Sequence, residues 1–165
     1  MDRFALEKLK QWKEKKNRKP LIIRGARQVG KTWLMKEFGR TCFKKMAYVN
    51  FDSNTRMRQV FEGDINIERL ILAISAETGV SIDSRDTLLI FDEVQEVPKA
   101  LTALKYFCEE ASEYAIVAAG FFQTCRSHPG FKIKSGVEFY SDAAGEGKQE
   151  IYLRTGKRRC TSQRL

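Results

Sequence analysis

The chain has 165 residues, of which 42% are hydrophobic and 31% charged, values typical of one globular domain with a hydrophobic core. Its longest apolar run, residues 114–122, is too short for the ~20 residues that cross a bilayer, so we expect no membrane association. The charged start of the chain is unlike a secretory signal, and four scattered cysteines without a C-x-x-C pair indicate reduced thiols. We therefore expect a cytoplasmic protein without a structural metal.

The net charge of +9 is concentrated at the two ends of the chain. Residues 1–20 carry +5 and residues 132–165 carry +4, whereas residues 21–131 are neutral. Basic termini allow a nucleic-acid-binding module as an alternative function. The neutral core argues against it, because the charge excess lies outside the segment that carries the motifs described below.

The first predicted element is a basic amphipathic helix over residues 3–16, within an N-terminal unit of residues 1–19. Ala5, Leu9 and Trp12 recur at helical spacing, and lysines occupy the other face. We interpret this helix as packed through its apolar face with its lysines in solvent.

A strand over residues 20–24 is followed by a complete G-x-x-x-x-G-K-[ST] phosphate-binding loop. Such a loop wraps backbone N–H groups around a triphosphate at the start of a helix. Lys31 is expected to reach the β- and γ-phosphates, and Thr32 to offer its hydroxyl to Mg²⁺. The predicted nucleotide-binding residues are Gly25, Ala26, Arg27, Gln28, Val29, Gly30, Lys31, Thr32 and Trp33.

Strands and helices then alternate, which predicts an α/β fold whose parallel sheet is covered on both faces. Hydrophobic periodicity, turn residues and caps give the following elements: a strand over 46–52, helices over 56–61 and 65–78, a strand over 87–91, a helix over 98–111 and a strand over 115–119.

The strand over 87–91 leads into two adjacent carboxylates, Asp92 and Glu93. Ligands of open α/β sheets bind at the carboxyl ends of the strands, so this is where Mg²⁺ and the γ-phosphate are expected. Asp92 is the candidate Walker-B aspartate for the metal, together with Thr32. Glu93 is the candidate base for the attacking water, and with Lys31 it forms the predicted catalytic pair. No Asn-Lys-x-Asp guanine-reading motif is found.

Four segments together resemble prokaryotic AAA-type ATP-binding proteins, a family in which an ATPase domain precedes a C-terminal domain of unknown function. These segments are residues 18–32, 48–52, 89–96 and 118–120. The resemblance implies ATP and Mg²⁺ as ligands, a P-loop NTPase three-layer sandwich over residues 20–140 and the sheet order 5-1-4-3-2. It leaves the process driven by hydrolysis, the partner and the oligomeric state open.

The resemblance weakens after Gly120. The family continues with a polar residue that senses the γ-phosphate, whereas this chain has Phe121 and Phe122, which lack the necessary hydrogen-bonding groups. Residues 136–140 match the family's fifth strand only briefly, and no arginine finger or second sensor is assigned. We therefore expect weak ATP hydrolysis or none, and a strand over 20–24 that lies near an edge of the sheet with poorly covered apolar residues.

Three interpretations remain for residues 121–165. The first is a frame change or truncation, which would make the basic tail over 141–165 a segment not selected to fold. The second is a hairpin that pairs residues 137–141 with residues 150–154. The third is a basic arm for nucleic acid with Lys157, Arg158 and Arg159 on phosphates.

Overall fold

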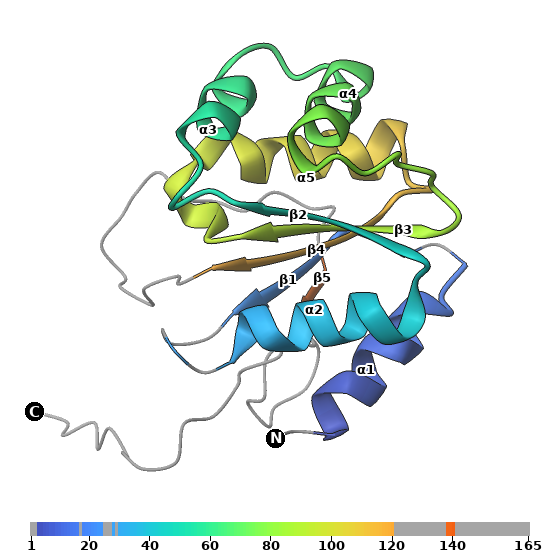
Figure 1. Cartoon of the computed structure of the whole chain (residues 1–165). Helices are drawn as coiled ribbons and strands as arrows, with labels where there is room; N and C mark the ends of the chain where they lie inside the picture. The colour runs from blue at the N-terminus through green and yellow to red at the C-terminus, as the bar shows by residue number, and fades with distance from the viewer. Residues whose placement is uncertain (1–2, 17, 25–27, 29, 121–137, 141–165) are drawn as a thin grey trace, which may run out of the picture.

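The computed structural model describes residues 3–16, 18–24, 28, 30–120 and 138–140 (Figure 1). Within these residues, five strands form one sheet in the order β2-β3-β4-β1-β5, and each neighbouring pair is parallel. This order is the one predicted from the sequence resemblance. The strands are β1 (Leu21–Arg24), β2 (Lys45–Asn50), β3 (Thr87–Asp92), β4 (Ala115–Gly120) and β5 (Glu138–Tyr140).

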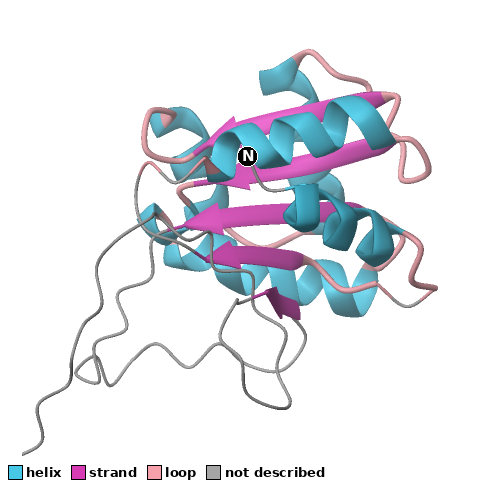
Figure 2. Cartoon of the chain, turned by 90° about the horizontal axis from the view of Figure 1, so that it is seen from below, coloured by secondary structure: helices cyan, strands magenta, loops and turns pink. Residues whose placement is uncertain are grey.

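Helices cover both faces of the sheet and complete the predicted three-layer α/β sandwich (Figures 1 and 2). One face carries α1 (Arg3–Lys13) and α2 (Lys31–Cys42). The other face carries α3 (Thr55–Glu62), α4 (Ile67–Thr78) and α5 (Pro98–Glu110). A short 3₁₀ helix, η1 (Val94–Glu96), follows β3 and was not predicted from the sequence.

The central strands β3 and β4 are buried along their whole length, as their uninterrupted apolar runs predict. Each face of the sheet has its own hydrophobic cluster, because alternate side chains point to opposite faces. In β2, Ala47 and Val49 point toward α3, α4 and α5, whereas Met46 and Tyr48 point toward α1 and α2. Tyr48 therefore lies on the face that also carries the start of α2.

Helix α1 packs into the core beside α2 through the apolar face predicted for it. Leu9 and Trp12 are fully buried, and the Trp12 ring meets the Phe38 ring edge-on with centroids 6.1 Å apart. The Trp12 indole N–H donates a hydrogen bond to the Lys19 carbonyl at 2.9 Å, which fixes the chain between α1 and β1. The helix ends at Lys13, three residues before the predicted end.

Helix α2 lies close to β2 because Gly39 has no side chain. A Cβ at residue 39 would come within 2.7 Å of the Met46 sulfur. The apolar face of α2, formed by Leu34, Met35 and Phe38, is buried against the sheet. The position of α2 relative to β2 and β3 is therefore set by packing along the helix.

β1 lies near an edge of the sheet, next to the edge strand β5, but the expectation that its apolar residues are poorly covered is wrong. β1 pairs with β4 on one side and with β5 on the other, with Ile22 opposite Phe139. Leu21, Ile22 and Ile23 are fully buried. Three residues of β5 are enough to pair the backbone of a four-residue strand, although the surrounding segment has little strand-like pattern. Residues 138–140 of the proposed hairpin form β5, whereas its second arm over 150–154 and the proposed basic arm lie outside the described residues.

We predict that α1 is an integral part of the folded domain and that replacing Leu9 by Ala destabilises it. Removing a fully buried leucine side chain costs its transfer free energy plus a cavity term, about 2–5 kcal/mol of the free energy of unfolding. Urea unfolding followed by circular dichroism measures this change. Gln11→Ala, on the exposed face of α1, is the control and should change stability by less than about 0.5 kcal/mol. Equal stabilities of the two variants would show that residues 1–19 form a separate arm.

Candidate functional site

The described end of the phosphate-binding loop turns directly into α2. Gly30 is the N-cap residue of the helix and has a φ of 88°, a left-handed conformation that glycine adopts without steric cost. The first N–H groups of α2 have no partners within the helix and carry its partial positive charge, which favours an anion at this end. Gln28 is described as well, whereas four predicted residues (Gly25, Ala26, Arg27 and Val29) lie outside the described residues.

The two motifs meet through Thr32 and Asp92. The Thr32 hydroxyl donates a hydrogen bond to Asp92 Oδ2 at 2.5 Å, although the residues are 60 positions apart in the sequence. Lys31, which precedes Thr32, is buried with 5% of its surface exposed. A hydroxyl that donates its proton to a carboxylate keeps its oxygen lone pairs for another partner. The contact thus joins the start of α2 to the end of β3.

Asp92 is almost completely buried, with 1% exposure, and its carboxylate accepts three hydrogen bonds from residues that the structure describes. Oδ2 accepts from Thr32 and from the Tyr48 hydroxyl at 3.0 Å, and Oδ1 accepts from the backbone N–H of Glu93 at 3.1 Å. Buried charges need such partners, because desolvation is costly. A carboxylate and a hydroxyl are oxygen ligands of the kind Mg²⁺ prefers, so these residues fit a magnesium ion held mainly by phosphates and water.

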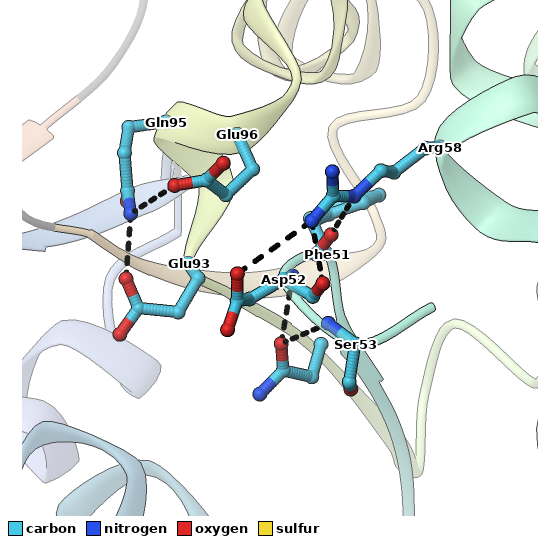
Figure 3. Close-up of polar contacts among 8 residues, drawn as sticks. Phe51, Asp52, Ser53, Arg58, Glu93, Gln95 and Glu96 are labelled. Carbon is cyan, nitrogen blue, oxygen red and sulfur yellow. Dashed lines mark hydrogen bonds and ion pairs between the residues drawn. The ribbon is translucent and has the colours of Figure 1, made fainter. Parts of the chain in front are cut away.

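Glu93 has an unusual backbone conformation, with φ 52° and ψ 44° in the left-handed region. Non-glycine residues rarely adopt it, and such strain is often found at functional sites. The Gln95 amide donates to Glu93 Oε2 at 2.6 Å and lies 3.3 Å from Glu96 Oε1 (Figure 3). The η1 turn therefore holds the Glu93 carboxylate beside the end of β3.

A pocket of about 470 Å³ opens between these elements. Its walls bring together several of the predicted residues from the loop, from α2 and from the end of β3. Trp33 lies at its rim with 45% of its surface exposed. The lining residues are Gln28, Gly30, Lys31, Thr32, Trp33, Lys36 and Glu93.

Hydrogen bonds also fix the chain where it leaves β2, next to the site. The Asn50 side-chain oxygen accepts the backbone N–H groups of Asp52 and Ser53 at 2.8 and 3.3 Å, which turns the chain and ends β2 before the predicted residue 52. The Arg58 guanidinium donates to the carbonyls of Phe51 and Asp52 (Figure 3). These contacts fix the chain that leaves the strand on which Tyr48 lies.

Sequence reasoning missed four residues that complete the site: Tyr48, Asn50, Gln95 and Lys36. Tyr48 and Asn50 lie within a segment that resembles the AAA-type family, and their i, i+2 spacing in a strand places them on one face. Lys36 follows Thr32 by four residues on a helix and thus lies on its face. No pattern in the sequence indicates that Gln95 turns back to Glu93.

The parallel sheet, with β4 between β1 and β3, and the loop at the start of α2 together define a P-loop ATPase-like module. Residues 17–126 match the family model described as an AAA domain. The chain therefore belongs to this AAA-domain family, and the match extends six residues beyond the point where the sequence resemblance weakens.

The solved structure of C. elegans PCH-2 is similar to this chain with 17% identity and a TM-score of 0.42. The similarity covers 73% of this chain and 35% of that one, so this chain spans about a third of the length of the solved protein. No curated protein matches the sequence.

In the part of the chain that the structure describes, no helix has the length and apolar character needed to span a bilayer. Likewise, within the described residues no three His, Cys, Asp or Glu side chains form a group suited to a metal ion.

We predict that the left-handed backbone at Glu93 reduces stability. The comparison is between Glu93→Gly and Glu93→Ala, which both lack the carboxylate and its contact with Gln95. Alanine retains the steric penalty of the left-handed conformation and glycine does not, so the glycine variant should be more stable by about 1 kcal/mol. Thermal and urea unfolding of the two variants measure the difference. A more stable alanine variant would contradict the prediction that the backbone at Glu93 is strained.

Proposed function

We propose that this chain binds ATP together with Mg²⁺ and hydrolyses ATP slowly to ADP and phosphate. The observation that carries the proposal is the 2.5 Å hydrogen bond between Thr32 and Asp92, at the edge of a pocket that Lys31 and Glu93 also line. A phosphate-binding lysine, a metal-binding hydroxyl with its carboxylate, and a second carboxylate are the groups that phosphoryl transfer to water requires.

The start of α2 and Lys31 are suited to bind the β- and γ-phosphates. The helix N-terminus offers N–H groups and a partial positive charge, and the Lys31 ammonium adds a full charge. Thr32 and Asp92 are the residues that would hold the metal, directly or through water. Mg²⁺, when bound, would neutralise the phosphate charge and fix the phosphate oxygens in place.

Glu93 is the candidate general base. Its carboxylate would accept a proton from a water molecule while the water oxygen forms a bond to the γ-phosphorus. The bond from that phosphorus to the bridging oxygen breaks at the same time, and ADP leaves with the electron pair. Gln95 would orient the carboxylate through its amide, which donates to the Glu93 Oε2 atom at 2.6 Å.

The choice of ATP over other triphosphates follows from the family, because the described residues include no base-reading motif. The expectation of slow hydrolysis follows from Phe121 and Phe122, which lie outside the described residues.

A nucleic-acid-binding function finds no separate support in the basic helix α1. Lys10 pairs with Glu7 at 2.8 Å, and the Lys13 ammonium donates to the Cys42 carbonyl at 2.5 Å.

Lys31→Ala should weaken ATP binding by at least about 100-fold, because the ammonium supplies charge-assisted hydrogen bonds in a buried position. Isothermal titration calorimetry with Mg-ATP measures the affinity. Lys44→Ala is the matched control, since Lys44 is exposed and precedes β2 at the opposite edge of the sheet. Unchanged affinity in the Lys31 variant would contradict the proposal.

Glu93→Gln should leave ATP affinity within about threefold and lower the single-turnover rate of phosphate release by about 100-fold or more, the usual contribution of a general base. Glutamine keeps the size of the side chain and removes its basicity. Glu110→Gln is the control, because this exposed carboxylate at the end of α5 does not line the pocket. Equal rates in the wild type and the Glu93 variant would exclude Glu93 as the base.

A further inference from the structure

The Tyr48 side chain runs along β2 toward the carboxyl edge of the sheet. Its backbone lies opposite Ile90 of β3, two residues before Asp92, and its hydroxyl reaches Asp92 Oδ2 at 3.0 Å. The Asn50 amide lies 3.4 Å from the same hydroxyl oxygen and donates to it. The Tyr48 oxygen thus accepts one hydrogen bond from β2 and donates another to β3.

This hydroxyl completes the surroundings of the buried carboxylate. Thr32 and Tyr48 occupy Oδ2, and the Glu93 N–H occupies Oδ1. A carboxylate held on both oxygens cannot rotate without breaking a hydrogen bond. The orientation of Asp92, and with it that of the Thr32 hydroxyl, therefore depends in part on Tyr48.

The Tyr48 ring is itself fixed by a cation. The Lys36 ammonium lies 3.9 Å from the ring centroid, a cation–π contact, and Lys36 also lines the pocket. The Tyr48 hydroxyl is the donor in its contact with Asp92 Oδ2, and a carboxylate oxygen can only accept.

We propose that Tyr48 is a positioning residue that holds Asp92 in the orientation with which Thr32 and Asp92 bind Mg²⁺. This inference rests on the proposed function, because it assigns Tyr48 to the metal side of the same site. Tyr48 acts through Asp92 and is not among the residues that line the pocket. Its loss should therefore weaken the metal dependence of nucleotide binding and leave the phosphate contacts intact.

The test is Tyr48→Phe, which removes the hydroxyl and keeps the ring beneath Lys36. ATP affinity is measured by calorimetry in EDTA and over a series of Mg²⁺ concentrations. We expect the ATP affinity of the variant in EDTA to stay within twofold of the wild type. The Mg²⁺ concentration that produces half of the increase in ATP affinity should rise about tenfold, which is the size expected for loss of a hydrogen bond to a charged group. Tyr106→Phe, on α5 across the sheet, is the matched control and should match the wild type.

A double-mutant cycle separates positioning from a general structural effect. In an Asp92→Asn background, Tyr48→Phe should shift the Mg²⁺ dependence by less than twofold, because its partner carboxylate is already lost. An equal shift in both backgrounds, or an equal loss of affinity with and without Mg²⁺, would overturn the inference.

The wild type distinguishes this inference from the proposed function. If the wild-type chain binds Mg-ATP and Tyr48→Phe leaves the Mg²⁺ dependence of binding unchanged, this inference alone is overturned. A wild-type chain that binds no ATP would overturn the proposed function and this inference together.

Discussion

A carboxylate that is removed from water at the end of a buried strand must find hydrogen-bond donors in the protein, and Asp92 finds them on two other elements and on the next residue of its own chain segment. Thr32 donates from the start of α2, Tyr48 from β2, and the Glu93 N–H from the residue after β3. The two side-chain donors reach Asp92 only because β2 is in register with β3 and the start of α2 lies beside the end of β3. The site therefore depends on the fold being complete on this side of the sheet.

The hydrophobic core on that side determines where α2 lies. Phe38 packs against Trp12 of α1, and the absence of a side chain at Gly39 brings the helix close to β2. Because a helix is stiff over a few turns, packing near its end restricts the position of Thr32 at its start. The geometry of the candidate site therefore depends on the core. Helix α1 contributes to it because Trp12 packs against Phe38 of α2.

The fold was largely predictable from the sequence, because its signals are local. The apolar runs of β3 and β4, the loop that ends at Thr32 and the spacing of Leu9 and Trp12 each indicate their own element. Sheet order followed from the resemblance to a family. The pairing of β5 with β1 was underestimated, since three residues carry little pattern of their own and the partner lies more than 100 residues away.

The sequence predicts the motif residues of the candidate site, but it does not predict the residues that hold them in place. Lys31, Thr32, Asp92 and Glu93 follow from spacing, whereas the contact between Tyr48 and Asp92 depends on strand register and side-chain rotamers. Figure 3 illustrates the same limit at Gln95, whose amide turns back to Glu93 because the chain forms a 3₁₀ turn after β3. The sequence likewise does not indicate the left-handed backbone of Glu93, because the residues that commonly adopt this conformation are glycine and asparagine.

The unequal burial of the two tryptophans has a practical consequence. Trp12 is fully buried in the core, whereas Trp33 lies at the rim of the pocket with nearly half of its surface in water. Indole emission depends on the polarity around the ring. A ligand that enters the pocket would change the surroundings of Trp33 alone, and loss of the fold would change those of both. Tryptophan fluorescence can therefore follow two events in this chain: Trp33 responds to occupation of the pocket, and Trp12 responds to loss of the core.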